Sequence, residues 1–330
     1  MEIVAWRALA RRRILSILRK RRVASLRQLE SKISEAGPHD IRPEPHHVKP
    51  ALDQLLTEGT VYRVDEVHVR TNTPTPLYAD PSFDPTLPSD FQRLASVKAA
   101  YETYLTHVLS PQGGRPLELV VQGSVEQAHD ALHWFGGAAT IPAGPLIDGR
   151  SFTDHSKLDH LLLDRETSLI IGVEDKNHRE WIYPHSEYLR TFLAKCVLYD
   201  IVPLFITRRL PYISRRVLPE IGVLAFQTFH QFVAPEQAEV LALARHTDGL
   251  GFHDIRFTTE PLPTLVNYFR TTMPARLPTT YDTFQACKEV LYEYAVARSI
   301  EYDGLIRELE VFYPKSEEEE FGPDDYLDYY

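Results

Sequence analysis

The stretch that decides the fold is residues 156–182, SKLDHLLLDRETSLIIGVEDKNHREWI. Two short apolar runs, at residues 158–163 and 169–173, flank a polar turn at residues 164–168. Each run has the length of a strand and lacks the spacing of polar residues that an amphipathic helix requires. The sequence therefore predicts a β-hairpin.

Three ionisable side chains are expected at one end of this hairpin. Side chains alternate between the two faces of a strand, so Glu174 and Lys176 share one face, and Asp175 points to the other. An antiparallel fold-back brings Asp159, near the start of the first strand, opposite the end of the second. We therefore expect Asp159, Glu174 and Lys176 to converge on one spot.

This grouping is suited to phosphodiester hydrolysis. Mg²⁺ prefers oxygen ligands and keeps several waters, so two carboxylates form an ordinary site for it. Such an ion stabilises the charge that develops on a phosphate during in-line attack and lowers the pKa of a bound water. We expect Asp159 and Glu174 to hold Mg²⁺, with Mn²⁺ able to substitute, and Lys176 to add preorganised positive charge at a catalytic site.

The pattern of Asp159, a hairpin and then Glu174-Asp175-Lys176 resembles the PD-(D/E)XK phosphodiesterase superfamily, the restriction-endonuclease-like nucleases. The resemblance covers roughly residues 89–235. It implies an α/β fold with an αβββαβ core around a mixed sheet, and a metal-dependent endonuclease activity. Further elements fit this order: an amphipathic helix at 184–200, a buried strand at 201–207, a short helix at 214–222 and a strand at 223–228.

Two positions depart from the superfamily pattern. Leu158 stands where a proline often precedes the first acid, and Asp175 occupies a place more often taken by a small or apolar residue. A bare Glu-x-Lys triplet has almost no specificity, so its strand context must support the site. The alternative for the same three residues is a solvated set of salt bridges on a surface hairpin.

The N-terminus predicts a separate basic domain. Residues 1–30 are rich in arginine and lysine and carry an apolar stripe at helical spacing, which is typical of a cationic amphipathic helix. Ser25 is a candidate N-cap for a second helix at 26–33. A third helix at about 45–56 is followed by two predicted strands, at 60–64 and 66–70.

Three helices followed by a hairpin resemble a winged-helix domain, here residues 1–72, whose third helix enters the major groove of DNA. Clustered cationic side chains are the usual electrostatic footprint of nucleic-acid binding. The candidate DNA contacts are Arg11, Arg12, Arg13, His46, His47, Lys49, Arg63 and Arg70. Winged helices also serve as protein-protein modules, and that alternative stays open.

The remaining boundaries follow from composition. A Pro-rich polar segment at 73–89 predicts a linker, and the nuclease core would then span residues 90–234. A helical C-terminal region at 235–315 carries aromatic residues that we expect to form a packing face or a dimer interface. Residues 316–330 form an acidic tail.

Inside the predicted core, the segment before the hairpin is expected to hold a helix at 90–109, a strand at 117–122 and a helix at 125–135. The first helix and the strand would be the first two elements of the nuclease core. Glu102 is the only acid in the middle of that helix and is a possible additional acid of the site. A glutamate on a helix is more commonly just a solvent-facing residue.

Composition narrows the class of protein. The chain has 330 residues and a net charge of −10, which does not exclude a nucleic-acid partner because the distribution of charge matters more than its sum. Cys196 and Cys287 match no metal spacing and no disulfide framework, which favours a reducing, cytoplasmic location. No apolar stretch approaches the ~20 residues that span a bilayer, so no membrane partner is expected.

Two function classes follow. The first is a Mg²⁺-dependent endonuclease acting on DNA, most directly double-stranded DNA, and expected to be a homodimer because it would cut two strands. The second is a catalytically inactive nuclease-like DNA-binding regulator or adaptor. Restriction, junction resolution, repair and phage defence all stay open as biological roles, as does RNA in place of DNA.

Overall fold

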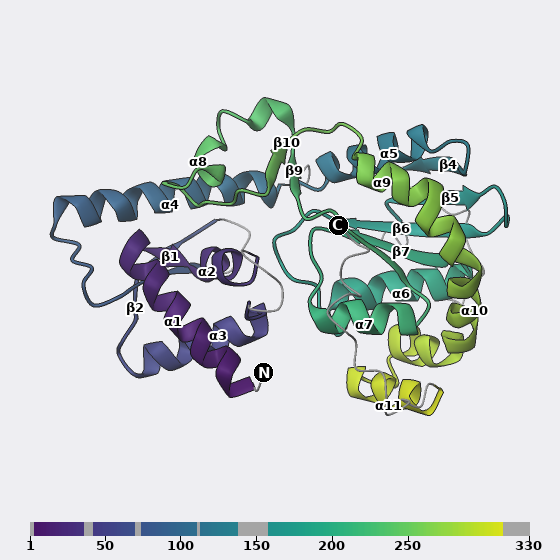
Figure 1. The fold of residues 1–330 in the computed structure, drawn as a ribbon, viewed down its shortest axis with the longest axis horizontal. Helices are drawn as coiled ribbons and strands as arrows, with labels where there is room; N and C mark the ends of the chain where they lie inside the picture. The colour runs from purple at the N-terminus through teal and green to yellow at the C-terminus, as the bar shows by residue number, and fades with distance from the viewer. Residues whose placement is uncertain (1–2, 36–41, 70–73, 111–112, 138–157, 313–330) are drawn as a thin grey trace.

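The computed structural model describes residues 3–35, 42–69, 74–110, 113–137 and 158–312 as an α/β protein (Figure 1). Arg70 and the acidic tail at 316–330 lie outside these ranges. Among the helices of the described ranges, none is both long and apolar enough to cross a membrane.

The first three helices form a small bundle: α1 (Ile3–Arg21), α2 (Leu26–Ile33) and α3 (Pro45–Thr57). They confirm the three predicted helices. Ser25 caps α2, because its side chain accepts a hydrogen bond from the N–H of Gln28 while the Gln28 side chain accepts one from the N–H of Ser25. The helices bury one shared apolar cluster, which includes Ile14, Leu18, Leu29, Ile33, Val48, Leu52 and Leu55.

The strand after α3 corrects the prediction of a turn within it. β2 (Tyr62–Val67) is one continuous strand across the predicted strands at 60–64 and 66–70. Its pairing shifts register between Arg63 and Asp65. Such an irregularity lets the polar pair Asp65-Glu66, which resembles a turn in the sequence, remain inside a strand.

Segment 73–89, predicted as a linker, contributes a strand instead. β3 (Thr75–Ala79) pairs antiparallel with β2 and with the two-residue strand β1 (Ala24–Ser25), so it is the middle strand of this small sheet. Pro76 pairs with Glu66 of β2 beyond the two residues that β1 reaches. At that position β3 has a neighbour on one side only, where the missing N–H of proline is tolerated.

A five-stranded mixed sheet in the order β4-β5-β6-β7-β8 forms the second part of the molecule (Figure 1). β4, β5 and β6 pair antiparallel, whereas β6, β7 and β8 pair parallel. The predicted hairpin is present as β5 and β6. The strands are β4 Leu132–Gly137, β5 His160–Asp164, β6 Ile170–Lys176, β7 Val202–Thr207 and β8 Leu224–Gln227.

Helices cover both faces of this sheet. Because side chains alternate along a strand, Leu204 and Ile206 of β7 join the apolar cluster that holds the buried face of α5, and Phe205 joins the cluster on the opposite face. On that face the ring centroids of Phe205 and of Phe192 on α6 are 5.7 Å apart. The helices next to the sheet are α5 Arg115–Gln127, α6 Glu187–Tyr199 and α7 Tyr212–Glu220.

Two predictions before the hairpin are wrong. Residues 117–122, expected as a strand, belong to α5; of the stretch 125–135 that was expected to be helical, α5 includes residues 125–127 and β4 includes residues 132–135. The adjacent valines in α5 favoured a strand by propensity. The apolar residues nevertheless recur at helical spacing, and all are buried: Leu117, Val120, Val121 and Val125.

The helix expected at 90–109 is α4 (Pro88–Val108), but it does not lead directly into the sheet. It packs against β2 and the short helix α8 (Ala242–Arg245) in an apolar cluster of its own. The same cluster includes residues of two short parallel strands, β9 (Gln231–Val233) and β10 (Ile255–Phe257). The helix that precedes β4 is therefore α5.

The C-terminal region is helical, as predicted, with different bounds. Phe284 and Tyr294 are buried in the cluster shared with α6, so part of the predicted aromatic face is a packing face. The expected helix at 235–244 is only a 3-10 turn followed by α8. The elements are η3 Pro235–Gln237, α9 Pro263–Asn267, the π-helix η4 Tyr268–Thr272, α10 Met273–Leu291, the π-helix η5 Tyr292–Ala297 and α11 Tyr302–Phe312.

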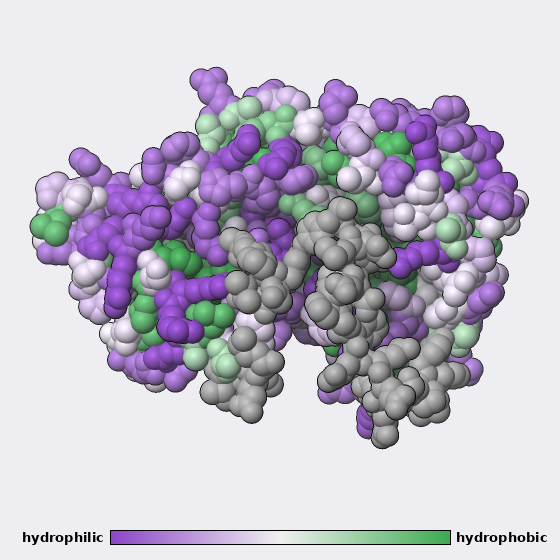
Figure 2. All heavy atoms as spheres, in the orientation of Figure 1, coloured by the Kyte–Doolittle hydropathy of each residue, from purple (hydrophilic) through white to green (hydrophobic). Residues whose placement is uncertain are grey.

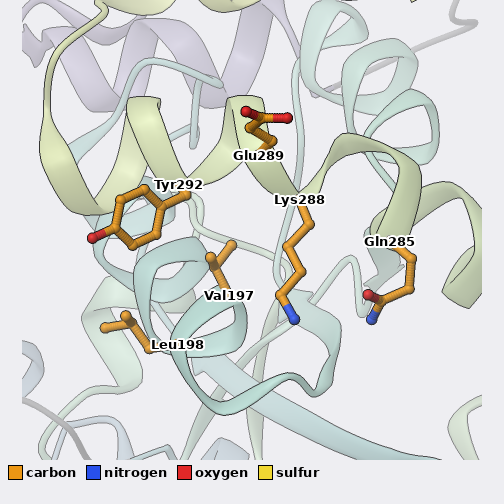
Figure 3. A pocket seen from close by; sticks show the side chains of 6 residues that line it. All are labelled: Val197, Leu198, Gln285, Lys288, Glu289 and Tyr292. Carbon is orange, nitrogen blue, oxygen red and sulfur yellow. The ribbon is translucent and has the colours of Figure 1, made fainter. Parts of the chain in front are cut away.

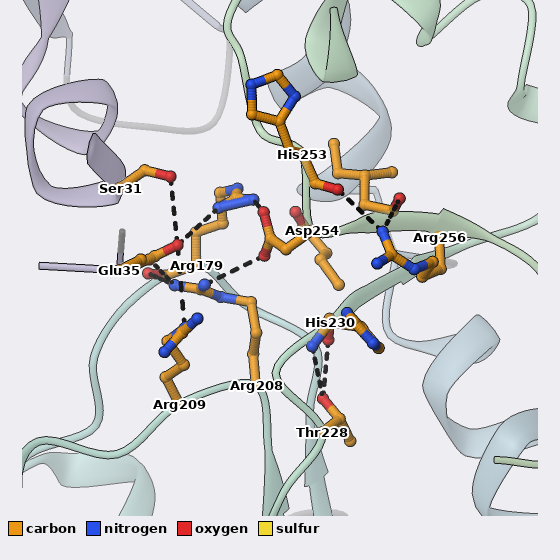
Figure 4. Close-up of polar contacts among 12 residues, drawn as sticks. Ser31, Glu35, Arg179, Arg208, Arg209, Thr228, His230, His253, Asp254 and Arg256 are labelled. Atoms are coloured by element: carbon orange, nitrogen blue, oxygen red, sulfur yellow. Dashed lines mark hydrogen bonds and ion pairs between the residues drawn. The ribbon is translucent and has the colours of Figure 1, made fainter. Parts of the chain in front are cut away.

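A buried charged cluster joins the N-terminal bundle to the sheet (Figure 4). Arg208 follows β7, and its side chain is 1% exposed; its Nη2 lies 2.6 Å from Glu35 Oε1 and its Nη1 3.2 Å from Asp254 Oδ2. Arg179 also pairs with Asp254, and its guanidinium lies 3.9 Å from the ring centroid of Phe252. We call Glu35, Arg179, Arg208 and Asp254 the charged clamp.

Glu35 is ionised inside this clamp. Burial raises the pKa of its carboxyl, but the charges of Arg208 and Arg179 outweigh burial and bring the pKa down to about 2. A buried pair that loses one partner leaves an uncompensated charge, which is far more costly than breaking an exposed pair.

We expect Glu35→Gln to lower the free energy of unfolding by about 3–5 kcal/mol, because it leaves two buried arginines, Arg208 and Arg179, with Asp254 as the one remaining anion of the clamp. Stability from Glu35 is present above its ordinary pKa of 4.5 and lost as pH falls toward about 2, so the variant should lose less stability than wild type across that window. Urea unfolding at several pH values measures both effects. Asp53→Asn, which breaks the exposed pair with Lys49, is the control and should cost under about 1 kcal/mol.

Candidate active site

The β5–β6 hairpin brings Asp159 to the end of β6. The last residue pair of the β5–β6 ladder is His160 and Val173. Just beyond it, the backbone N–H of Asp159 donates to the carbonyl of Val173 at 3.1 Å. The Asp159 carboxylate in turn accepts a hydrogen bond from the N–H of Asp175, with 2.7 Å between Oδ2 and N. The first acid is therefore held against the backbone between Glu174 and Lys176.

The carboxylate of Glu174 lies between two ammonium groups. Its Oε1 is 2.7 Å from Lys176 Nζ, and its Oε2 is 3.0 Å from Nζ of Lys195 on α6. All three side chains are largely buried, with exposed fractions of 10% for Glu174, 16% for Lys176 and 8% for Lys195. The site is thus a compact group of two acids and two lysines.

The two acids interact electrostatically. Burial raises the pKa of Asp159, and the neighbouring charge of Glu174 raises it further, to about 7. For Lys176, burial lowers the pKa, but the Glu174 carboxylate outweighs burial and raises it, so the lysine is charged. Because Asp159 is buried and the two carboxylates repel each other, one of them is held partly protonated. A bound cation would reduce this repulsion and stabilise both in their ionised form.

The donor set fits a cation that keeps most of its water. In the parts of the chain that the structure describes, no three His, Cys, Asp or Glu side chains gather as a metal cage. Asp159 and Glu174 would supply two oxygen ligands. This matches Mg²⁺, which is commonly bound through one or two carboxylates and completes its shell with water and substrate phosphate oxygens.

Asp175 lies on the opposite face of β6, as the strand alternation predicts. Its Oδ2 is 2.8 Å from Nε2 of His160, and the two side chains are only 1% and 2% exposed. For His160, burial lowers the pKa, but the charge of Asp175 and its hydrogen bond outweigh burial and raise it. This pair accounts for the unusual acid between Glu174 and Lys176: it is a buried ion pair behind the site.

An aromatic pair flanks Lys176. The ring of Tyr188, half-exposed near the start of α6, has its centroid 5.5 Å from Lys176 Nζ and stacks on His178 at 6.2 Å. Burial and then the charge of Lys176 lower the pKa of His178, which favours its neutral form. A half-exposed ring beside the lysine could contact a nucleotide next to a bound phosphate.

Sequence reasoning missed Lys195 at the site and Glu118 near the His160–Asp175 pair behind it. Lys195 lies 19 residues beyond Lys176 on a different element, so no local pattern joins it to Glu174. Glu118 lies on α5, the helix that precedes the strands, and its charge raises the pKa of His160. It was hidden because this segment was predicted as a strand. Glu102 lies instead on α4, which packs against β2 and α8.

Several predicted DNA contacts form ion pairs with acids of the same chain at the protein surface. Arg11 forms a two-pronged pair with Glu58, at 2.8 Å and 2.6 Å, which ties α1 to the end of α3. Lys49 Nζ lies 2.7 Å from Asp53 Oδ2 on the same helix. Arg63 pairs with Glu66 along β2.

The remaining predicted contacts differ in exposure. His47 is buried, with its ring centroid 6.4 Å from that of Trp6, and burial lowers its pKa to about 4, so it is a packing residue rather than a groove contact. Arg13 donates to the carbonyl of Ile33 at 3.3 Å. His46 and Arg12 are exposed, and Arg70 lies outside the described residues.

The exposed basic side chains gather on α1: Arg7, Arg12, Arg19 and Lys20. Figure 2 shows hydrophilic side chains gathered at the left of the molecule, where α4 and the C-terminal end of α1 lie in Figure 1. The basic surface of the N-terminal part is thus centred on α1 rather than on the helix expected to enter the groove.

A hollow elsewhere on the surface lies between α6 and α10 (Figure 3). Its one lysine, Lys288, is 2.6 Å from Asp200. The residues that line the hollow do not include two acids beside a lysine, as the site at the end of β6 does, so we assign it no chemistry. Its lining residues are Val197, Leu198, Gln285, Lys288, Glu289 and Tyr292.

Comparison with known proteins adds no relative, because no family model, no curated protein and no solved structure matches this chain. The function must therefore be argued from the site itself.

We expect Asp159→Asn to stabilise the protein in metal-free buffer at pH 8. A carboxyl whose pKa is raised from 3.8 to about 7 contributes stability that is lost as pH rises through that window, and asparagine removes the charge. The melting temperature should rise by roughly 2–4 °C at pH 8 and be unchanged at pH 4. Asp53→Asn, on the exposed surface of α3, is the matched control. An equal shift at both pH values would contradict the assignment.

Proposed function

We propose that this protein is a metal-dependent nuclease that hydrolyses phosphodiester bonds in DNA. The observation that carries the proposal is the convergence of Asp159, Glu174 and Lys176 at the end of β6, with Asp159 hydrogen-bonded to the strand that bears the other two. Asp159 directly precedes β5, whereas Glu174 and Lys176 lie on β6, and a solvated surface set would not need the burial of Glu174 and Lys176.

The arrangement of elements supports membership of the restriction-endonuclease-like fold. The order α5, β4, β5, β6, α6 and β7 corresponds to the αβββαβ core that the resemblance to the PD-(D/E)XK superfamily implies. The mixed sheet, antiparallel up to β6 and parallel from β6 onward, agrees with it. In this interpretation α5, rather than α4, is the first helix of the core.

The chemistry assigns each residue a role. A divalent cation held by Asp159 and Glu174 would supply charge stabilisation at the phosphate and a more acidic water. The attacking water releases a proton to solvent as its oxygen forms a bond to phosphorus, the bond from phosphorus to the leaving sugar oxygen breaks, and that oxygen takes a proton from solvent. The Lys176 ammonium, charged beside Glu174, stabilises the negative charge that develops on the phosphoryl oxygens.

The N-terminal part would supply affinity for DNA. Its three helices and the β2–β3 hairpin are consistent with a winged helix, and the exposed arginines of α1 are suited to phosphate contacts. Such contacts hold a protein on nucleic acid without reading its sequence. A homodimer, with one site for each strand of a duplex, is part of the same proposal.

One observation favours the alternative, an inactive nuclease-like DNA-binding regulator. Glu174 already has two ammonium partners, Lys176 and Lys195, so its charge is balanced without a metal ion. An inactive protein could keep this set as a structural ion-pair network. Activity measurements on variants of the site separate the two.

We expect the wild-type protein to cleave DNA with Mg²⁺ or Mn²⁺, and Asp159→Ala, Glu174→Ala and Lys176→Ala each to reduce the rate by at least about a hundredfold. Linear, circular and branched substrates, single- and double-stranded, are incubated with the metal, and products are resolved by gel electrophoresis. Lys288→Ala, which removes a lysine from an ion pair outside the site, should cleave like wild type. Cleavage that survives Asp159→Ala and Lys176→Ala would place the activity elsewhere.

We expect the double variant Arg12→Ala, Arg19→Ala to bind DNA more weakly, with a shallower salt dependence. Removing one contact between an arginine and a phosphate reduces the slope of log K against log salt by about 1. Binding is measured by fluorescence anisotropy at several salt concentrations. Arg270→Ala, which removes an exposed arginine from the C-terminal helical region, is the control and should leave the slope unchanged. An unchanged slope in the double variant would favour a protein-protein role for this part.

A further inference from the structure

Lys195 is placed unlike an ordinary surface lysine. It lies on the buried face of α6, 8% exposed, with Nζ 3.0 Å from Glu174 Oε2. Its neighbours along the helix, Ala194 and Cys196, belong to the apolar cluster beneath the sheet. A lysine is almost never this buried unless it has a partner, and its partner here is a proposed metal ligand.

We propose that Lys195 is a positioning residue that occupies the side of Glu174 where a second divalent cation would bind, so that the site takes one ion. The inference rests on the proposed function, because it concerns how the same acids bind metal. The two oxygens of Glu174 then have different tasks. Oε2 stays with Lys195, and Oε1, now paired with Lys176, is the oxygen available to a metal ion.

The charges of the site support one ion rather than two. Asp159 and Glu174 contribute at most two negative charges, and the ammonium groups of Lys176 and Lys195 already lie against Glu174. Two-metal sites clamp both the attacking and the leaving oxygen with cations held about 3.5–4 Å apart. A second divalent ion at Glu174 would lie close to a fixed ammonium group, and like charges at such distances repel strongly in a buried site.

The two lysines differ in freedom. Lys195 projects from the middle of a helix that packs on the sheet, so its ammonium group is fixed against Glu174. Lys176 is the last residue of β6, twice as exposed at 16% against 8%, and lies beside the half-exposed ring of Tyr188. Lys176 can therefore turn toward a bound phosphate, while Lys195 keeps the charge and orientation of Glu174.

The test counts bound Mn²⁺ on the full-length protein by isothermal titration calorimetry and by electron paramagnetic resonance. The variants are Lys195→Met, which keeps the aliphatic stem without the charge, Lys195→Gln as a second neutral variant, and Lys195→Arg, which keeps the charge. Lys288→Met, which removes a lysine from the pair with Asp200, is the matched control. Circular dichroism melting reports whether each variant folds.

We expect wild type, Lys195→Arg and Lys288→Met to bind one Mn²⁺ with similar affinity. Lys195→Met and Lys195→Gln should bind a second ion, or bind the first at least about tenfold more tightly, because a competing cation has been removed. This gain in metal binding is not expected of a residue that only supports the fold.

Three results would overturn the inference while leaving the nuclease proposal standing. They are folded neutral variants with the stoichiometry and affinity of wild type, a wild-type protein that binds two ions, and failure of both neutral variants to fold, which would assign Lys195 a purely structural role. If wild type binds no Mn²⁺ and Asp159→Asn behaves identically, the metal site itself is wrong, and the proposed function falls together with the inference.

Discussion

The hydrogen bond from the backbone N–H of Asp175 to the carboxylate of Asp159 is the interaction on which the site depends. It joins the start of β5 to the end of β6 at the point where the antiparallel ladder stops. Through it the first acid is placed by the backbone, and Glu174 and Lys176 follow because they are the neighbours of Asp175 on the same strand. The buried His160–Asp175 pair on the other face fixes the side chain of that residue, so β6 is held from both sides.

Local sequence patterns were sufficient to predict the structure wherever the interacting residues are close in sequence. The hairpin from β5 to β6 and the convergence of Asp159, Glu174 and Lys176 follow from alternation along a strand and from one turn. The start of α2 follows from the capping residue Ser25. Such features depend on fewer than about 20 residues of sequence, and periodicity and capping chemistry determine them almost completely.

Predictions from the sequence failed where tertiary contacts override propensity. The valine-rich segment of α5 has strand propensity, but its buried face packs as a helix on the face of the sheet opposite α6. The prolines in and around β3 are typical of a linker, yet pairing with β2 and β1 makes this segment a strand. Lys195 could not be joined to the site, nor Glu118 to the His160–Asp175 pair behind it, because their helices meet the strands only in three dimensions.

The charged clamp determines how the two parts of the molecule could cooperate. Glu35 follows α2 in the N-terminal bundle, Arg208 follows β7, and the two meet with almost no exposure to water. On the same interface Arg27 of α2 lies 2.6 Å from Glu180, four residues beyond Lys176. Breaking a buried ion pair is costly, so the basic surface of α1 and the acids of β6 are held at one fixed spacing. A buried charge network, unlike a flexible linker, does not let the two parts move toward each other. Under the proposed function, a nucleic acid bound along α1 would therefore have to extend or bend to reach the site.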